Sequence, residues 1–202
     1  MPKQTFFNLN EEKRKNIEKA IINEFSKVSI EKLSISRIVE DARIPRGSFY
    51  QYFEDKEDAI KYIIEKYIQM EYEKIEQFLK ETNGDIFEGA IKIFDYTIEM
   101  TLDTKKMKLC KNILEQLRKN NINIFENNNN LKKNNNILQI IDTKKLNIEN
   151  EEDLKCIMKI LNTVTRTTSM EVITKNISKE NGREILIKEL EILKYGMLKW
   201  WQ

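Results

Sequence analysis

The chain has 202 residues, of which 40% are hydrophobic and 34% charged, with a formal net charge of +2. Five glycines and two prolines are too few for tight-turned β architecture, and no run of about eighteen apolar residues marks a membrane span. There is no histidine, no glycine-rich phosphate loop, and no metal or disulfide pattern around Cys110 and Cys156. We therefore expect a cytoplasmic helical protein without signal peptide, catalytic site, metal or cofactor.

The first predicted helix begins after Asn10, a good N-cap that is followed by two glutamates in the first turn. Ile17, Ile21 and Phe25 recur every four residues and define its apolar stripe. Residues 29–32 break this period, and we expect a short connection there.

Two short helices follow this connection. The second helix has Ser34 as its candidate N-cap and Ile38 and Ala42 on its buried face. Pro45 favours the start of a new helix and disfavours helical geometry just before it, so we predict a third helix over residues 46–52. This spacing is typical of a helix-turn-helix. On spacing alone, an ordinary hairpin of two helices stays open as the alternative.

The rest of the chain also has a helical period. The remaining long helices are predicted over residues 55–81, 85–102, 105–118, 151–175 and 180–201. Between them, ten of the 17 residues from 120 to 136 are asparagine, which favours a loop, with a short helix that begins at Leu131 or Ile137 and ends at Ile141. The predicted fold is all-α with about nine helices.

The stretch from Leu33 to Ile60 resembles the DNA-binding signature of the TetR family of bacterial repressors. The matching features lie in the second helix, in the short third helix and before the fourth, and are carried by Ile38, Ala42, Tyr50, Tyr52, Phe53 and Lys56. The detailed match covers about residues 11–70, a third of the chain. The resemblance implies a DNA-binding domain over residues 8–70, with the helix-turn-helix proper at about 34–53. Residues 71–202 would form a ligand-binding and dimerisation domain.

The third helix is the expected recognition helix. Arg46 and Gln51 are the best candidates for reading bases, because arginine pairs well with guanine and glutamine with adenine. Gly47 lets the helix approach the duplex closely. The expected contacts to the DNA backbone come from Ser34, Ser36, Arg37, Arg43, Ser48, Tyr50, Tyr52 and Lys56. Phe49 and Phe53 are expected to pack this helix onto the first and fourth helices.

The turn departs from the family pattern. The family commonly has glycine where this chain has Arg43, and serine or threonine where it has Pro45. A non-glycine residue in the left-handed region costs about 1–2 kcal/mol. Either the turn adopts another geometry, which we favour, or Arg43 accepts this strain and extends towards phosphate.

The resemblance also implies a homodimer built by the last two helices and an effector pocket among the middle ones. Trp200 and Trp201 suit an interface, because exposed apolar clusters usually mark one. Two recognition helices about 34–36 Å apart would read a palindromic operator in double-stranded DNA. The candidate pocket residues are Phe87, Phe94, Tyr96, Met100, Met107, Cys110, Ile113, Leu114, Met158 and Leu161.

A threonine-rich stretch at 163–169 surrounds Arg166. It is expected at the dimer seam, with an anion-binding pocket wall as the alternative.

The resemblance implies a repressor. Repression would end when a small, mostly apolar effector favours a state in which the two DNA-binding domains of the dimer lie farther apart. The alternative is a DNA-binding regulator without a small-molecule effector, controlled by a protein partner or by oxidation of Cys110. Two alternatives belong to other functional classes: an all-helical enzyme, and a helical scaffold that does not bind DNA.

Overall fold

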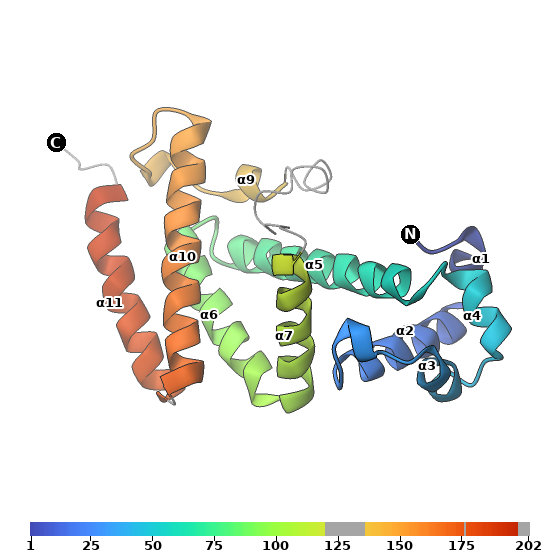
Figure 1. Ribbon diagram of the computed structural model, residues 1–202. Helices are drawn as coiled ribbons and strands as arrows, with labels where there is room; N and C mark the ends of the chain where they lie inside the picture. The colour runs from blue at the N-terminus through green and yellow to red at the C-terminus, as the bar shows by residue number, and fades with distance from the viewer. Residues whose placement is uncertain (120–135, 176, 198–202) are drawn as a thin grey trace. The chain divides into compact units, whose positions relative to one another are not determined.

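The computed structural model describes residues 1–119, 136–175 and 177–197, and this part of the chain is built from α-helices, which confirms the all-α class (Figure 1). The helices of these residues are α1 (Gln4–Phe7), α2 (Glu11–Phe25), α3 (Ile35–Asp41), α4 (Arg46–Tyr52), α5 (Lys56–Glu81), α6 (Ile86–Leu102), α7 (Thr104–Lys119), α9 (Asn136–Ile140), α10 (Glu151–Lys175) and α11 (Lys179–Met197). Two short 3₁₀-helices, η1 (Ile30–Lys32) and η2 (Thr143–Lys145), connect them. None of the described helices combines the length and apolar character that crossing a membrane requires. Most of the asparagine-rich loop predicted at 120–136, and the pair Trp200–Trp201, lie outside the described residues.

The predicted helix starts are confirmed by hydrogen bonds from the first turn. The side chain of Asn10 accepts from the backbone N–H of Lys13 at 2.8 Å. The carboxylate of Asp55 accepts from the N–H of Asp58 at 2.7 Å, and Asp85 caps α6 in the same way. Such caps satisfy N–H groups that have no partner within the helix, and each contributes about 1 kcal/mol.

The chain divides into two compact units. The first contains Met1–Glu71 with the described part of Asp103–Asn127, and the second contains Tyr72–Leu102 with the described part of Asn128–Gln202. Helix α5 therefore contributes residues to both units. Residues 71–202 are predicted to form one regulatory domain, whereas the packing places α7 with the N-terminal helices.

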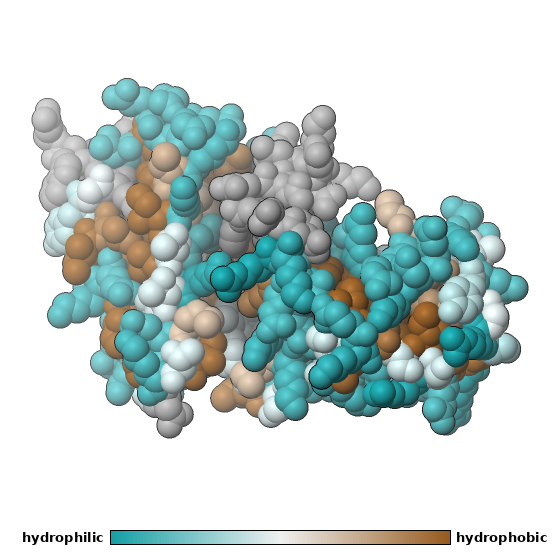
Figure 2. Space-filling view, viewed as in Figure 1, coloured by the Kyte–Doolittle hydropathy of each residue, from teal (hydrophilic) through white to brown (hydrophobic). Residues whose placement is uncertain are grey.

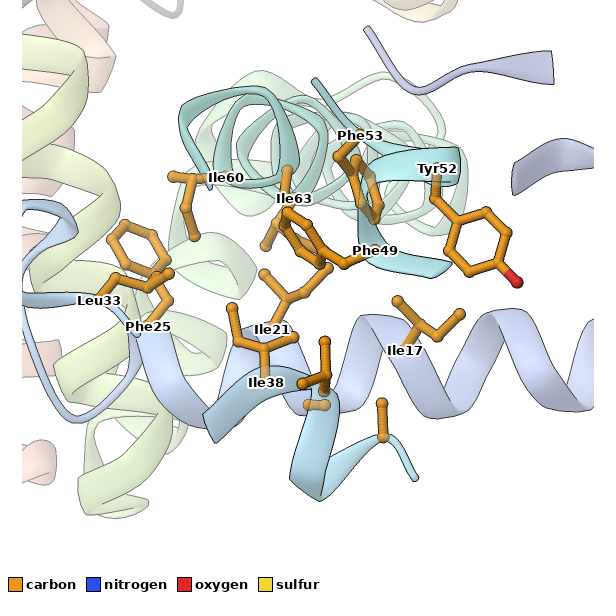
Figure 3. Packing of buried hydrophobic residues seen from close by; sticks show 14 of the residues in the cluster. Ile17, Ile21, Phe25, Leu33, Ile38, Phe49, Tyr52, Phe53, Ile60 and Ile63 are labelled. Atoms are coloured by element: carbon orange, nitrogen blue, oxygen red, sulfur yellow. The ribbon is translucent and has the colours of Figure 1, made fainter. Parts of the chain in front are cut away.

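The core of the first unit gathers apolar side chains from α2, α3, α4, α5 and α7 (Figure 3). The predicted stripe of α2 is fully buried there, and so are Phe49 of α4 and Phe53 directly after α4, as expected. Helix α7 adds Ile113 and Leu117. Full burial of each such side chain contributes about 1.5–3 kcal/mol. This burial holds α4 in place, since a seven-residue helix is not stable alone.

The core of the second unit lies between α6, α10 and α11, which pack against one another. Phe94 and Leu186 are fully buried, and Leu161 and Leu190 nearly so. Helix α9 and the segment after it cover part of this core with Ile141 and other apolar side chains. The apolar period of these helices therefore has the structural role that the sequence indicated.

Our favoured expectation for the turn between α3 and α4 was wrong, because Arg43 occupies the left-handed region with φ of +53°. The N–H of Arg43 donates to the carbonyl of Glu40 at 3.1 Å, and the N–H of Ile44 donates to that of Val39 at 3.0 Å. This pair of bonds is the Schellman motif, which usually carries glycine at the position of Arg43. Ile44 and Val39 are both buried, so the motif's two hydrogen bonds and its apolar contact outweigh the backbone strain.

Replacement of Arg43 by glycine should relieve this strain. We expect Arg43→Gly to raise the free energy of unfolding by about 1 kcal/mol, measured by urea denaturation. The matched control is Asn83→Gly at the end of α5, where Asn83 has φ of +52° in the same motif. Asparagine tolerates this conformation, so the control should change stability by less than about 0.5 kcal/mol. Equal effects at both positions, or a loss of stability at Arg43, would contradict this account.

Candidate nucleic-acid interface

Helix α4 has one buried edge and one exposed edge. Phe49 and Tyr52 face the core, whereas the exposed residues are Arg46, Gly47, Tyr50 and Gln51. All four belong to the set predicted to contact DNA. The helix thus exposes the side chains expected to read bases while its opposite edge is fixed by packing.

Arg46 is oriented by a neighbour on α3. Its Nη1 donates to Oγ of Ser36 at 2.7 Å, so two predicted contact residues from the two helices of the motif lie together. A guanidinium has five N–H donors in a planar fork. One bond to Ser36 therefore leaves donors available for a base edge or a phosphate.

The start of α3 is held by a buried carboxylate. Glu24 of α2 is only 3% exposed, and its Oε1 lies 3.2 Å from Nη1 of Arg37. The same oxygen accepts the backbone N–H of Ser34 at 3.3 Å. Ser34 stands at the N-cap position as predicted, but its side chain makes no capping bond. Glu24 instead anchors this helix start, and the exposed guanidinium of Arg37 extends from it.

Lys56 begins α5 at the position expected from the sequence. Its Nζ donates to the backbone carbonyl of Glu31 at 3.0 Å. Because this acceptor is an uncharged carbonyl, the bond does not offset the positive charge of Lys56 with a negative one. The Glu31 carboxylate lies 2.7 Å from Nζ of Lys119 on α7. The hydrogen bond from Lys119 lowers the pKa of Glu31 to about 2.

Tyr50 and Tyr52 of α4 differ in exposure. Tyr50 is 42% exposed, whereas Tyr52 is 6% exposed, with its ring centroid 6.1 Å from that of Phe6. The hydroxyl of Tyr52 points away from the apolar side chains around it (Figure 3). Ser48 is half-buried beside them. Of the three hydroxyls from Ser48 to Tyr52 on α4 that are predicted to contact phosphate, that of Tyr50 is therefore presented most openly.

Gly47 stands in open space. A Cβ atom built on it would meet no atom within 4 Å outside its own helix turn. Packing within the protein thus gives no reason for glycine at this position, and close approach of an external surface does.

Two family descriptions match the chain. "Bacterial regulatory proteins, tetR family" matches residues 17–63, and "Tetracyclin repressor-like, C-terminal domain" matches residues 85–197. The chain belongs to the TetR family. Because this family consists of regulatory proteins, the chain is not an enzyme.

Curated relatives of this TetR-family chain include HTH-type transcriptional regulators of Staphylococcus aureus. One from strain bovine RF122 / ET3-1 and one from strain USA300 are each 26% identical over 99 residues, which is 49% of this chain and 53% of the relative. The chain thus spans about half the length of the curated relatives it matches.

Solved structures with the same fold come from the same family. A TetR family transcriptional regulator from Chloroflexus aurantiacus has a TM-score of 0.50 at 24% identity, over 99% of this chain and 100% of that one. SmeT, the repressor of the Stenotrophomonas maltophilia multidrug efflux pump SmeDEF, has a TM-score of 0.64 at 14% identity, over 92% and 90%. The SmeT–triclosan complex also has a TM-score of 0.64, at 13% identity over 94% and 93%. These likenesses support the fold.

The residues predicted to line an effector pocket do not form one group. Those packed in the second unit, buried or half-buried, are Phe87, Phe94, Tyr96, Met100, Met158 and Leu161. Cys110 and Ile113 belong to the first unit. Met107, Leu114 and Arg166 are exposed. The structure therefore brings together only the first six in one compact unit.

An open hollow of about 490 Å³ lies on the first unit, between α2 and the turn that contains Arg43. Its lining is mostly polar, with Lys13, Lys19 and Asn23 among its residues. None of the residues predicted to bind an effector lines this hollow, and it belongs to the unit that contains α3 and α4.

Sequence reasoning missed the role of α7 in this head. The side-chain nitrogen of Asn112 donates to the carbonyl of Phe25, the last residue of α2, at 2.5 Å, and to that of Val28 beyond the helix at 3.2 Å. The carbonyl of Phe25 has no partner within the helix. The helical period of α7 indicated that one face is buried, but not which helix covers it.

Cys110 is shielded in the first unit. Its Sγ lies 2.7 Å from the hydroxyl of Tyr67, and burial raises the pKa of its thiol. Cys156, in contrast, is exposed on α10. The thiolate is the reactive form of cysteine, so a raised pKa lowers the reactivity of Cys110 at neutral pH.

Alkylation of the folded protein with iodoacetamide should therefore modify Cys156 well before Cys110, as followed by mass spectrometry. The rate at Cys110 should stay low until the pH exceeds the usual range for a thiol, because less thiolate is present at any lower pH. Urea-unfolded protein, in which both thiols are exposed, is the control. Equal rates in the folded protein would contradict the shielding of Cys110.

Proposed function

We propose that this chain is a transcriptional repressor that binds a palindromic operator in double-stranded DNA through α4. The observation that carries the proposal is the exposed edge of α4, which combines Arg46, Gly47 and Gln51 while its other edge is locked in the core. A major groove admits one α-helix, and base-edge contacts from such a helix specify sequence. In this proposal the protein acts in the cytoplasm.

Basic side chains around α4 support contacts to phosphate. Arg37 lies at the start of α3, Arg43 at the turn and Lys56 at the start of α5, and Arg37 and Arg43 are exposed. Backbone contacts of this kind fix the register of a protein on the duplex without reading its sequence. Residues 1–56 contain 11 Lys and Arg against 9 Asp and Glu. This small excess of positive charge supports phosphate contacts because basic side chains lie next to α4.

A substitution at Gly47 tests the effect on DNA affinity without a loss of folding stability. Gly47→Ala should leave the free energy of unfolding unchanged or raise it by up to about 1 kcal/mol, because its Cβ meets open space on a helix. In a complex, the same methyl group would overpack the interface by about 1–3 kcal/mol and weaken binding about fivefold or more. Fluorescence anisotropy with a duplex selected from a random library measures the affinity.

The matched control is Gly196→Ala on α11, whose Cβ also meets no atom within 4 Å. Because α11 belongs to the proposed dimer interface, dimer formation by this variant is checked by sedimentation velocity, and the affinity of the Gly196→Ala dimer for DNA should be unchanged. Unchanged binding by Gly47→Ala as well would mean that α4 does not enter the groove at this residue.

We further propose that the protein is a homodimer joined through α10 and α11. The outward side of α10 forms an uncharged stripe that consists of Ile160, Thr163, Thr167, Met170 and Thr174. Helix α11 adds Ile185, Ile192 and Tyr195, and Ile192 is 64% exposed. Apolar side chains gather over these two helices in the space-filling view (Figure 2). Surface clusters of this kind mark interfaces, and a second copy with the same helix pair is the occupant that we propose.

The threonines of α10 suit close packing of helices. The hydroxyl of Thr163 donates to the carbonyl of Lys159 at 2.8 Å, and that of Thr167 to the carbonyl of Thr163 at 2.8 Å. Because these hydroxyls are satisfied within their own helix, they need no partner from another chain. Short side chains of this kind agree with the dimer interface that we expected for residues 163–169. The alternative, an anion-binding pocket wall, is less well supported because Arg166 is exposed.

Ile192→Glu should break the dimer, since each unpaired buried charge costs about 3–5 kcal/mol and symmetry introduces two of them. Sedimentation velocity should show monomers for this variant and dimers for the unchanged chain. Glu191→Lys, which changes a charge at the exposed position next to Ile192, is the control and should remain dimeric. A dimer that survives Ile192→Glu would place the interface elsewhere.

We propose that a small, mostly apolar effector binds in the second unit and releases the operator. The SmeT–triclosan complex supports a small-molecule effector for a protein of this fold. Candidate contacts are the six residues grouped above in the second unit. Within the described residues, the chain passes between the units in α5, at Glu71–Tyr72, and again at Leu102–Asp103, and a ligand can bias the DNA-binding unit through these covalent connections.

The alternative control by thiol oxidation is less well supported, because Cys110 is shielded and the pKa of its thiol is raised.

A further inference from the structure

The last turn of the recognition helix is bonded by a segment far away in the sequence. The backbone N–H of Lys3 donates to the carbonyl of Tyr52 at 2.8 Å, and Nζ of Lys3 donates to the carbonyl of Tyr50 at 2.7 Å. Oγ1 of Thr5 donates to the carbonyl of Gln51 between them. Three consecutive carbonyls of α4, which have no partner within the helix, are thus satisfied by two residues.

An aromatic anchor keeps this segment in place. Phe6 of α1 is 0% exposed. Its ring centroid lies 4.9 Å from that of Phe53 and 5.3 Å from that of Tyr62. Aromatic pairs at these separations contribute about 0.5–1.5 kcal/mol beyond their buried area. Pro2 is buried as well. We name residues Pro2–Phe7 the α4 bracket.

The bonds of the bracket end on the carbonyls of residues that we propose as DNA contacts. Tyr50 and Gln51 lie in the last turn of a helix of only seven residues. Helix ends fray unless their free groups find partners, and a displacement of about 1 Å is enough to spoil a bidentate contact to a base. Affinity for an operator therefore depends on what holds this turn.

We propose that the α4 bracket is a positioning element of the DNA-binding head, which sets operator affinity by holding Tyr50 and Gln51 in place and does not contact DNA itself. This inference rests on the proposed function of α4. Thr5 is its decisive residue, because its hydroxyl holds the carbonyl of Gln51.

The test compares Thr5→Val, which keeps the shape but removes the hydroxyl, with Thr5→Ser, which keeps the hydroxyl. Binding is measured with the full-length chain, untagged at its N-terminus, on a duplex selected from a random library by the unchanged protein. Thr5→Val should weaken binding about three- to tenfold, the effect of one hydrogen bond, and Thr5→Ser should restore it. The slope of affinity against salt concentration should stay the same in Thr5→Val, because no phosphate contact is lost.

A second readout needs no DNA. Hydrogen exchange followed by mass spectrometry should show faster exchange in α4 of Thr5→Val and unchanged exchange in α2. Unchanged exchange in α4, or equal binding by Thr5→Val and the unchanged chain while Arg46→Ala weakens binding, would overturn the bracket and leave the proposed function intact. If Arg46→Ala also had no effect, the proposed function itself would fail.

Lys3 provides the last check. In Lys3→Gln the salt slope should remain unchanged, because Lys3 bonds a carbonyl of α4. A slope reduced by about one would show that Lys3 contacts a phosphate directly, and would overturn the claim that the bracket does not touch DNA.

Discussion

The burial of Phe49 and Phe53 is the constraint on which the DNA-binding head depends. A helix of seven residues cannot pay the cost of its own nucleation in water, so α4 exists because its apolar edge packs against α2 and α5. That same packing decides which edge is exposed. Arg46, Gly47 and Gln51 are exposed because they lie opposite the buried edge.

The neighbours of α4 add orientation to this packing. Glu24 fixes the start of α3, Ser36 orients the guanidinium of Arg46, and the Schellman motif at Arg43 sets the turn between the helices. Each is a hydrogen bond worth about 1 kcal/mol, which is small beside the apolar core. Their role is geometric, since base recognition requires positions to be held within about 0.5 Å.

Much of this architecture could be predicted because the signals are local. The caps Asn10, Asp55 and Asp85 stand within three residues of the N–H groups they satisfy, and apolar periods show the buried faces of the long helices. The aromatic residues Tyr50, Tyr52 and Phe53, which stand just before Lys56, then indicated a helix-turn-helix of the TetR type. The predicted set of exposed contacts on α4 follows from the same periodicity.

The features that could not be predicted depend on distant partners. Helix α1 is too short to show a period, and Phe6 meets Phe53 and Tyr62 only in the folded chain. The burial of one face of α7 was visible, but not that Asn112 would bond the end of α2. At Arg43, local preference argued against the left-handed conformation, and nonlocal burial of Ile44 prevailed.

We propose that α4 reads DNA as one of a symmetric pair. Selection of the chain on a random library of duplexes, followed by sequencing, tests this proposal. We expect enrichment of a palindrome whose half-sites are centred about one or two helical turns apart. Enrichment of an asymmetric single site, or no enrichment above nonspecific binding, would contradict it.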